Sequence, residues 1–270
     1  MPFASIPARN LDVFYEARGS GDPVVLIGGF TSTVATWGRQ VGLLSERFRV
    51  IALDNRGSGR TRVIDDDGVR SPVIWSDDVA AFCDQLALPA IHLVGVSMGG
   101  VIAQAFATQH ESRLRSLTLM CTTPGGDHAP AVPLDVLQGV VRGSQPDPTD
   151  DDIDALARAV AHPETRTKRR EAWECFLATR LAESHTVDEM QRRQAGLRGF
   201  TAWDELANLS VPTLVMTGSD DRLVPPENSR ALADRIPGAE LQIIHDGGHI
   251  FFVEQSHAVN QALLAFLTCH

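Results

Sequence analysis

The stretch Gly95-Val96-Ser97-Met98-Gly99 decides the fold of this chain. An apolar run typical of a buried strand, Ala90 to Val94, leads into it, and a run typical of a helix, Gly100 to Ala107, follows it. A G-x-S-x-G between strand and helix is typical of a nucleophile elbow, a turn so sharp that its central residue is forced towards positive φ. We therefore predict that Ser97 stands clear of the backbone at the N-terminus of a helix, where amide groups favour negative charge.

Apolar runs and helix-like segments alternate on both sides of this turn. Such alternation is the pattern of a mostly parallel sheet that helices cover on both faces. The predicted strands span residues 11–16, 24–27, 49–53, 90–94, 114–120, 211–217 and 240–244, and the predicted helices span residues 76–86, 100–107, 227–235 and 257–268.

The apolar strands stop between residues 125 and 205. This part of the chain carries helix-like runs with an acidic cluster, Asp147 to Asp154, and a basic cluster, Arg166 to Arg170. We predict that residues 125–205 form a helical cap, and that residues 1–124 and 206–270 form the core. The cap would cover the C-terminal edge of the sheet, where open α/β sheets place their sites.

Composition and charge argue against several classes of partner. The 270 residues include 43% hydrophobic and 21% charged residues, which is ordinary for a globular protein. The net charge of −10 argues against nucleic acid and anionic membranes as partners. No apolar stretch approaches the roughly 20 residues that cross a bilayer, and no basic and apolar leader is evident, so a cytoplasmic location is expected. The four scattered cysteines predict free, buried thiols, and the oligomeric state is left open.

A serine hydroxyl needs a base to remove its proton and a carboxylate to orient that base. Two aspartates, Asp220 and Asp221, follow the strand 211–217, and His249 follows the strand 240–244. The chain order serine, aspartate, histidine differs from the chymotrypsin-like and subtilisin-like orders and matches the α/β-hydrolases.

Three further segments make the resemblance to the α/β-hydrolase fold family specific. Residues 54–61 resemble the D-x-R-G-x-G-x-S stretch of the family, residues 218–225 its G-x-x-D-x-x-V-P acid loop, and residues 247–254 its G-G-H-x-x-x-x-E base loop. The matches span nearly the whole chain outside residues 125–205. The resemblance implies a mostly parallel, eight-stranded, doubly wound sheet with a helical cap, but it does not identify the substrate.

Carried over to this sequence, the resemblance implies that Ser97 is the nucleophile, His249 the base and Asp221 the acid, because Asp221 occupies the fourth place of G-x-x-D. Asp220 is the rival acid, with a turn or capping carboxylate as its alternative role. His245 is the rival base. A metal pair of His245 and His249 is disfavoured because no helix aligns the two side chains, so neither a metal nor an organic cofactor is expected.

The oxyanion of the tetrahedral intermediate also needs hydrogen-bond donors. The expected donors are the backbone amides of Met98 and Phe30. The family commonly has H-G where this chain has Gly28-Gly29, and this departure removes a side chain that often braces the loop.

An apolar acyl or alcohol pocket, roofed by the cap, is expected beside these groups. The basic residues Arg166, Arg169 and Arg170 offer an alternative contact for a substrate carboxylate, although a solvated helix face is favoured for them. The apolar residues that flank the catalytic positions in the sequence are Phe30, Met98, Val224, Phe251 and Phe252. The predicted pocket residues are Gly29, Trp173, Phe176, Val224 and Phe251.

The predicted function is hydrolysis of a small-molecule carboxylic ester or lactone through an acyl-enzyme, with enol-lactonase-like and small carboxylesterase-like members as the closest resemblance. The same three residues also suit cleavage of carbon–carbon bonds in dienoate-type ketones, and cofactor-free haloperoxidase chemistry. A ligand-binding receptor with vestigial hydrolase activity is the alternative from another class.

Overall fold

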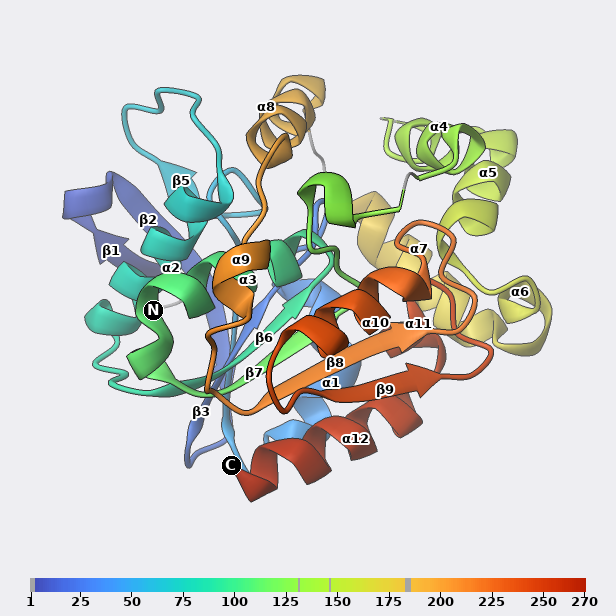
Figure 1. Ribbon diagram of the computed structural model, residues 1–270. Coiled ribbons are helices and arrows are strands. Elements are labelled where there is room, and N and C mark those ends of the chain that lie inside the picture. The colour runs from blue at the N-terminus through green and yellow to red at the C-terminus, as the bar shows by residue number, and fades with distance from the viewer. Residues whose placement is uncertain (1–2, 131, 146, 183–185) are drawn as a thin grey trace.

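A single sheet with helices on both faces forms the body of the protein in the computed structural model, which describes residues 3–130, 132–145, 147–182 and 186–270 (Figure 1). Eight strands follow the order β1-β2-β4-β3-β6-β7-β8-β9, and β5 pairs with β2 beside this path. Pairing is parallel from β4 to β9 and antiparallel for β1, β2 and β5. The strands are β1 Phe3–Ile6, β2 Leu11–Arg18, β3 Pro23–Ile27, β4 Arg49–Leu53, β5 Arg62–Val63, β6 Ile91–Val96, β7 Leu114–Met120, β8 Thr213–Gly218 and β9 Glu240–Ile244.

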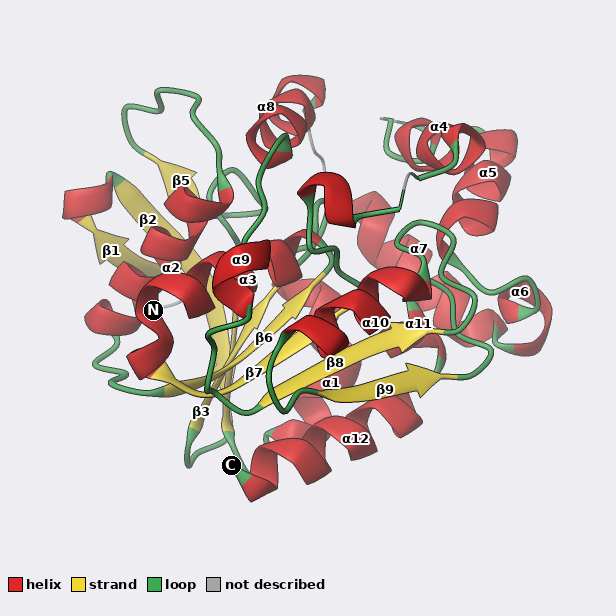
Figure 2. Ribbon diagram, viewed as in Figure 1, coloured by secondary structure: helices red, strands yellow, loops and turns green. Residues whose placement is uncertain are grey.

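Alternate side chains of the central strands enter two separate hydrophobic cores, as the pleat of a strand requires. In β3, Val25 and Ile27 pack on one face, whereas Val24 and Leu26 pack on the other. Figure 2 shows the sheet between its two layers of helices. The helices of the first face are α2 Pro72–Gln85, α3 Met98–His110, α9 Trp203–Leu206 and α10 Pro226–Arg235, and those of the second are α1 Gly38–Leu44, α11 Phe251–Glu254 and α12 Ser256–Cys269.

Helices also predominate between residues 125 and 205, as the sequence predicts. In Figure 1 the arrowheads of β8 and β9 point towards α6 and α7 of this segment. Its helices build a third hydrophobic cluster around Leu156 and Trp173, which includes Ile250 from the loop after β9. That these helices form a separate cap stays a prediction. They are α4 Leu134–Arg142, α5 Asp150–Val160, α6 Thr165–Lys168, α7 Arg170–Ala182 and α8 Val187–Leu197.

The predicted fold is confirmed, and several details differ from the prediction. The helix expected at 76–86 begins earlier, because Ser71 caps it by accepting a hydrogen bond from the Ile74 amide and Pro72 occupies its first turn. The edge strands β1 and β5 were not predicted. All four cysteines are free, but Cys175 and Cys269 are exposed rather than buried. No helix in the described ranges is long and apolar enough to cross a membrane.

The turn between β6 and α3 has the strained geometry that its sequence predicts. Ser97 has φ 55° and ψ −118°. A Cβ atom on Gly95 would lie 2.2 Å from the Gly99 carbonyl oxygen, and one on Gly99 would lie 2.2 Å from the Ile27 carbonyl oxygen. Both contacts are with backbone, which cannot swing away, so strand β6, helix α3 and strand β3 meet only because these positions lack side chains.

Replacing Gly99 with alanine tests this close approach. We expect Gly99→Ala to lower the free energy of unfolding by about 1–3 kcal/mol, since the new methyl group must push the β3 backbone away. Gly42→Ala in helix α1 is the matched control, because a Cβ there meets nothing within 4 Å. That variant should be unchanged or more stable by roughly 0.5–1 kcal/mol. Urea unfolding measures both, and equal stability of the two variants would contradict the steric account.

Candidate active site

Ser97 and His249 line the same cavity, although they lie far apart in the sequence. Ser97 directly follows strand β6, and His249 follows strand β9. The cavity has a volume of about 150 Å³. Gly29, in the loop after β3, forms part of its wall so close to the serine that a Cβ on Gly29 would lie 3.2 Å from the Ser97 Cβ. The carboxyl ends of three parallel strands thus bring these groups to one edge of the sheet.

Asp221, rather than Asp220, is the carboxylate that holds His249. Asp221 Oδ2 lies 2.8 Å from His249 Nδ1, and the Asp221 side chain is fully buried. Its other oxygen accepts hydrogen bonds from the backbone amides of Leu223 and Val224, at 2.9 and 2.8 Å. Asp220 instead accepts a hydrogen bond from the Ser219 hydroxyl at the surface. The carboxylate orients the imidazole through Nδ1, which leaves Nε2 for other chemistry.

The loop that carries His249 is held by Glu254, a buried carboxylate in helix α11. One oxygen of Glu254 accepts a hydrogen bond from the Gly248 amide at 2.6 Å. The other accepts from the His162 amide at 2.8 Å and from the Thr165 hydroxyl at 2.6 Å. Glu254 therefore joins the histidine loop to the segment between α5 and α6.

Electrostatics favour the charged form of His249. Burial by itself lowers the pKa of the ring, but the adjacent Asp221 carboxylate outweighs it, and the pKa of His249 lies well above its ordinary value of 6.5. A raised pKa in the folded state means that protonated His249 stabilises the fold at pH below about 6.5. This stabilisation is lost as the pH rises through the folded-state pKa.

Cys121 is a buried neighbour of this pair that the sequence analysis did not place in the site. It directly follows β7, and its thiol, the Asp221 carboxylate and a His249 nitrogen all lie within 4.8 Å of one another. Such a group has the donor atoms of a metal site, but burial raises the pKa of the thiol and keeps it protonated, which disfavours ligation. Cys121 follows β7, which lies in the sheet between β6 and β8, the strands that precede Ser97 and Asp221. This position is the signal that could have placed Cys121 in the site.

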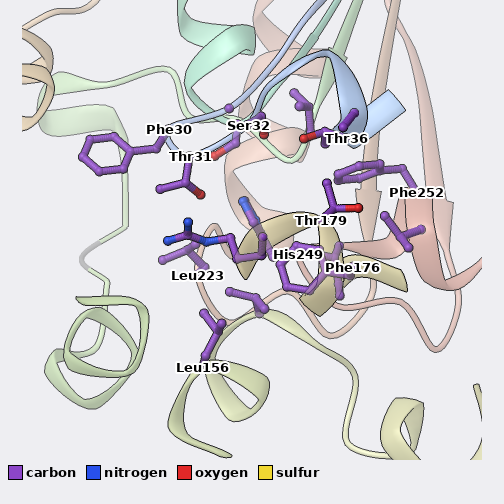
Figure 3. A pocket seen from close by; sticks show the side chains of 18 of the residues that line it. Phe30, Thr31, Ser32, Thr36, Leu156, Phe176, Thr179, Leu223, His249 and Phe252 are labelled. Atoms are coloured by element: carbon purple, nitrogen blue, oxygen red, sulfur yellow. The ribbon is translucent and has the colours of Figure 1, made fainter. Parts of the chain in front are cut away.

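The two predicted oxyanion donors come from different elements of the fold. Met98 is the first residue of α3, and the first amides of a helix have no acceptor within the helix, so the Met98 amide is available to a ligand. Phe30 belongs to the loop after β3, which lines the cavity. In Figure 3 the Phe30 ring points away from His249. The role of these two amides stays a prediction.

The cavity wall agrees with the predicted pocket in part. Gly29 and Phe176 line it, whereas Trp173, Val224 and Phe251 are not among its described lining residues. Trp173 is 5% exposed within the third cluster, and Phe251 is fully buried in the second core. The immediate neighbours Leu223 and Phe252 face the cavity instead (Figure 3). Adjacent residues of a loop or helix point in different directions, so Leu223 and Phe252 can face the cavity while their neighbours Val224 and Phe251 do not.

Polar groups of the wall were also missed, among them Thr31, Thr36, Thr179 and Arg180. They come from the loop before α1 and from helix α7, where sequence periodicity does not reveal which side faces the cavity. The basic cluster lies outside this wall: Arg166 pairs with Asp154, and Arg170 with Glu174, both on the surface.

Comparison with known proteins bears on the family. A family model described as alpha/beta hydrolase fold matches residues 22–256. RutD of Azorhizobium caulinodans, provisionally named a carbamate hydrolase, is 28% identical over 266 residues, or 98% of each chain. A thermophilic esterase from Thermogutta terrifontis has 30% identity and a TM-score of 0.80 over 96% of this chain and 93% of its own. The enol-lactonase from Burkholderia xenovorans LB400 has a TM-score of 0.82 over 99% of this chain and 100% of its own, and at 23% identity it supports the fold alone.

The coupling of His249 to Asp221 predicts how the imidazole titrates. By NMR, we expect a His249 midpoint above 6.5 in the wild type and a lower midpoint in Asp221→Asn, because an amide does not stabilise the imidazolium. Asp220→Asn is the matched control and should leave the midpoint near the wild-type value. If both substitutions lower it equally, Asp221 is not the specific partner of His249.

Proposed function

The chain belongs to the α/β-hydrolase fold family, and we propose that it is a serine hydrolase that cleaves a small carboxylic ester or lactone through an acyl-enzyme. The observation that carries the proposal is the arrangement at one cavity: an Asp221-bound imidazole and the strained Ser97 share it. A hydroxyl and an oriented imidazole beside a small cavity are what acyl transfer requires.

The first half of the proposed reaction forms the acyl-enzyme. Ser97 Oγ attacks the carbonyl carbon of the substrate while His249 Nε2 takes the hydroxyl proton. Asp221 holds the Nδ1 proton and stabilises the imidazolium. The amides of Phe30 and Met98 bind the oxyanion of the tetrahedral intermediate. When the intermediate collapses, the bond to the leaving oxygen breaks, and His249 gives its proton to the departing alcohol.

The second half releases the acid. A water molecule takes the place of the alcohol, His249 removes its proton, and the resulting hydroxide attacks the acyl carbon. Collapse of the second intermediate returns the proton to Ser97 and frees the carboxylic acid. Because the base must start unprotonated, kcat/KM should rise with pH through the pKa of His249, which Asp221 raises.

Two further observations support an ester-type bond. The cavity wall is largely apolar, with Leu156, Phe176, Leu223 and Phe252 around His249, which suits a neutral acyl group. In the comparisons, the solved relative at 30% identity is an esterase. Esters, lactones and carbamates all present a carbonyl carbon bonded to oxygen, so the same proposed steps apply to each bond.

Labelling and turnover test the role of Ser97. A fluorophosphonate should label the wild-type protein at Ser97, and Ser97→Ala should take up no label and lose about 10⁴-fold or more in ester turnover, since the nucleophile is gone. Ser32→Ala removes another serine hydroxyl from the same wall and should keep the label. Mass spectrometry of the labelled peptide reports the site. A wild-type protein that is folded but unlabelled would overturn the proposal and favour a binding protein.

The size of the cavity predicts acyl-chain preference. A space of about 150 Å³ holds a benzene-sized group, so kcat/KM for p-nitrophenyl esters should be highest for acyl chains of about two to six carbons. Phe176→Ala should shift the preference to longer chains by opening the wall. Glu174→Ala, on the exposed side of the same helix, is the control. A wild-type optimum at about twelve carbons would contradict this reading of the cavity.

A further inference from the structure

Arg193 is a buried cation in helix α8 that the proposed steps do not use. Its side chain is fully buried, and its Nε donates to Glu189 Oε1 at 3.2 Å. Its two terminal nitrogens donate to the backbone carbonyls of Phe30 and Gly57. Removing a guanidinium from water is costly unless its donors are satisfied, so a residue buried in this way is bound to specific acceptors.

One of those acceptors lies in the loop that is proposed to hold the oxyanion. Three successive carbonyls of this loop each accept a hydrogen bond: Gly28 from Asn55 Nδ2 at 3.0 Å, Gly29 from the Ser32 amide at 3.2 Å, and Phe30 from Arg193. The first two donors belong to residues 1–124, whereas Arg193 belongs to residues 125–205. The cation therefore connects the helical segment to the wall of the cavity.

The need for such a contact follows from the sequence. The glycine pair Gly28-Gly29 offers no side chain to brace the loop, and glycine backbone is the most mobile of all residues. The loop also passes Ser97 with little clearance, because a Cβ on Gly29 would lie 3.2 Å from the Ser97 Cβ. A small shift of this loop therefore changes the distance from its amides to the reacting carbonyl.

We propose that Arg193 is a positioning residue. By holding the Phe30 carbonyl it fixes the backbone directly after the Phe30 amide, so that this amide faces the oxyanion formed at Ser97. This proposal rests on the serine hydrolase function proposed above. Arg193 does not touch the substrate. It acts through the Phe30 carbonyl and, through the Gly57 carbonyl, ties the loop after β3 to the loop after β4.

The surroundings of Arg193 hold it in this position. Glu189 also accepts two hydrogen bonds from Arg70, at 2.9 and 2.8 Å, so the carboxylate is fixed from both sides. Gly57 has φ +78°, and a Cβ there would lie 2.1 Å from Glu189 Oε1. Helix α8 thus packs its ion pair directly against the backbone of the β4 loop.

Arg193→Met tests the proposal, because it keeps much of the volume and removes the donors. Arg192→Met is the matched control: Arg192 is the preceding residue of α8, is partly exposed, and pairs with Asp66 and Asp188 instead. We expect kcat for a short-chain ester to fall about 10- to 100-fold in Arg193→Met, with KM within about twofold, because misplaced oxyanion donors cost transition-state stabilisation. Arg192→Met should stay within about twofold in both.

Inhibition distinguishes positioning from a general loss of structure. A trifluoromethyl ketone of the same chain length forms an oxyanion on Ser97, so its Ki should rise in parallel with the loss of kcat/KM. The pH midpoint of kcat/KM should not change, since no hydrogen bond or ion pair among the described residues joins Arg193 to His249 or Asp221. Arg193→Lys, which restores a charged donor, should recover part of kcat.

Several results would overturn the proposal. In the first, Arg193→Met folds and has the same kcat and the same Ki for the ketone as Arg192→Met. In the second, Arg193→Met raises KM and leaves kcat unchanged. If Arg193→Met does not fold by circular dichroism, Arg193→Lys decides: wild-type values in every assay would refute positioning. A wild-type protein that neither takes up fluorophosphonate nor hydrolyses esters would instead refute the hydrolase function itself.

Discussion

The close approach of three backbone segments around Ser97 is the constraint on which the rest of the site depends. Strand β3, the end of β6 and the start of α3 meet where Gly95 and Gly99 leave room only for backbone. Holding Ser97 at φ 55° costs of order 1–3 kcal/mol, so the neighbouring structure must impose it. Hydrogen bonds do so: the Ser97 amide donates to the Met120 carbonyl at 2.8 Å, and the Thr122 hydroxyl donates to the Ser97 carbonyl at 2.8 Å. Since the end of β7 and the residues that directly follow it supply these contacts, the turn is a property of the sheet as well as of the local motif.

Burial of charge explains how the second half of the site is held. The Asp221 carboxylate is fully buried yet satisfied by two amides and the His249 ring. The Glu254 carboxylate, a few residues beyond the ring, is likewise satisfied by donors from three places in the chain. Each carboxylate fixes a loop that has no regular structure of its own. The loops can therefore be short and irregular while their side chains stay at defined distances, which is what proton transfer requires.

The parts of the structure that the sequence predicts well are those that local rules control. The strands 114–120 and 240–244 were predicted at their observed ends, because apolar runs between polar turns leave few alternatives. The pairing of Asp221 with His249 followed from the family pattern. Side-chain direction in the pocket did not follow. Phe251 and Phe252 both flank the catalytic positions and are both apolar, and only the packing of α11 decides that Phe252 lines the cavity and Phe251 does not. Cys121 was missed because its signal depends on the order of the strands in the sheet, where β7 lies between β6 and β8, and not on the residues next to it in the sequence.

Arg192 and Arg193 show most clearly where local reasoning ends. They are adjacent residues of the same type on one helix, yet the side chain of the first is 37% exposed and that of the second is fully buried. In a sequence, both have the appearance of a solvated helix face. Their difference arises because successive helical residues point about 100° apart and α8 packs one side against the loops after β3 and β4. A buried cation there requires acceptors supplied by residues more than a hundred positions away, Phe30 and Gly57. The loop with Gly28-Gly29 offers no side chain at these two positions, and Arg193 contacts the same loop from a distant helix. The loop and this contact are therefore separate in the sequence and meet only in the fold.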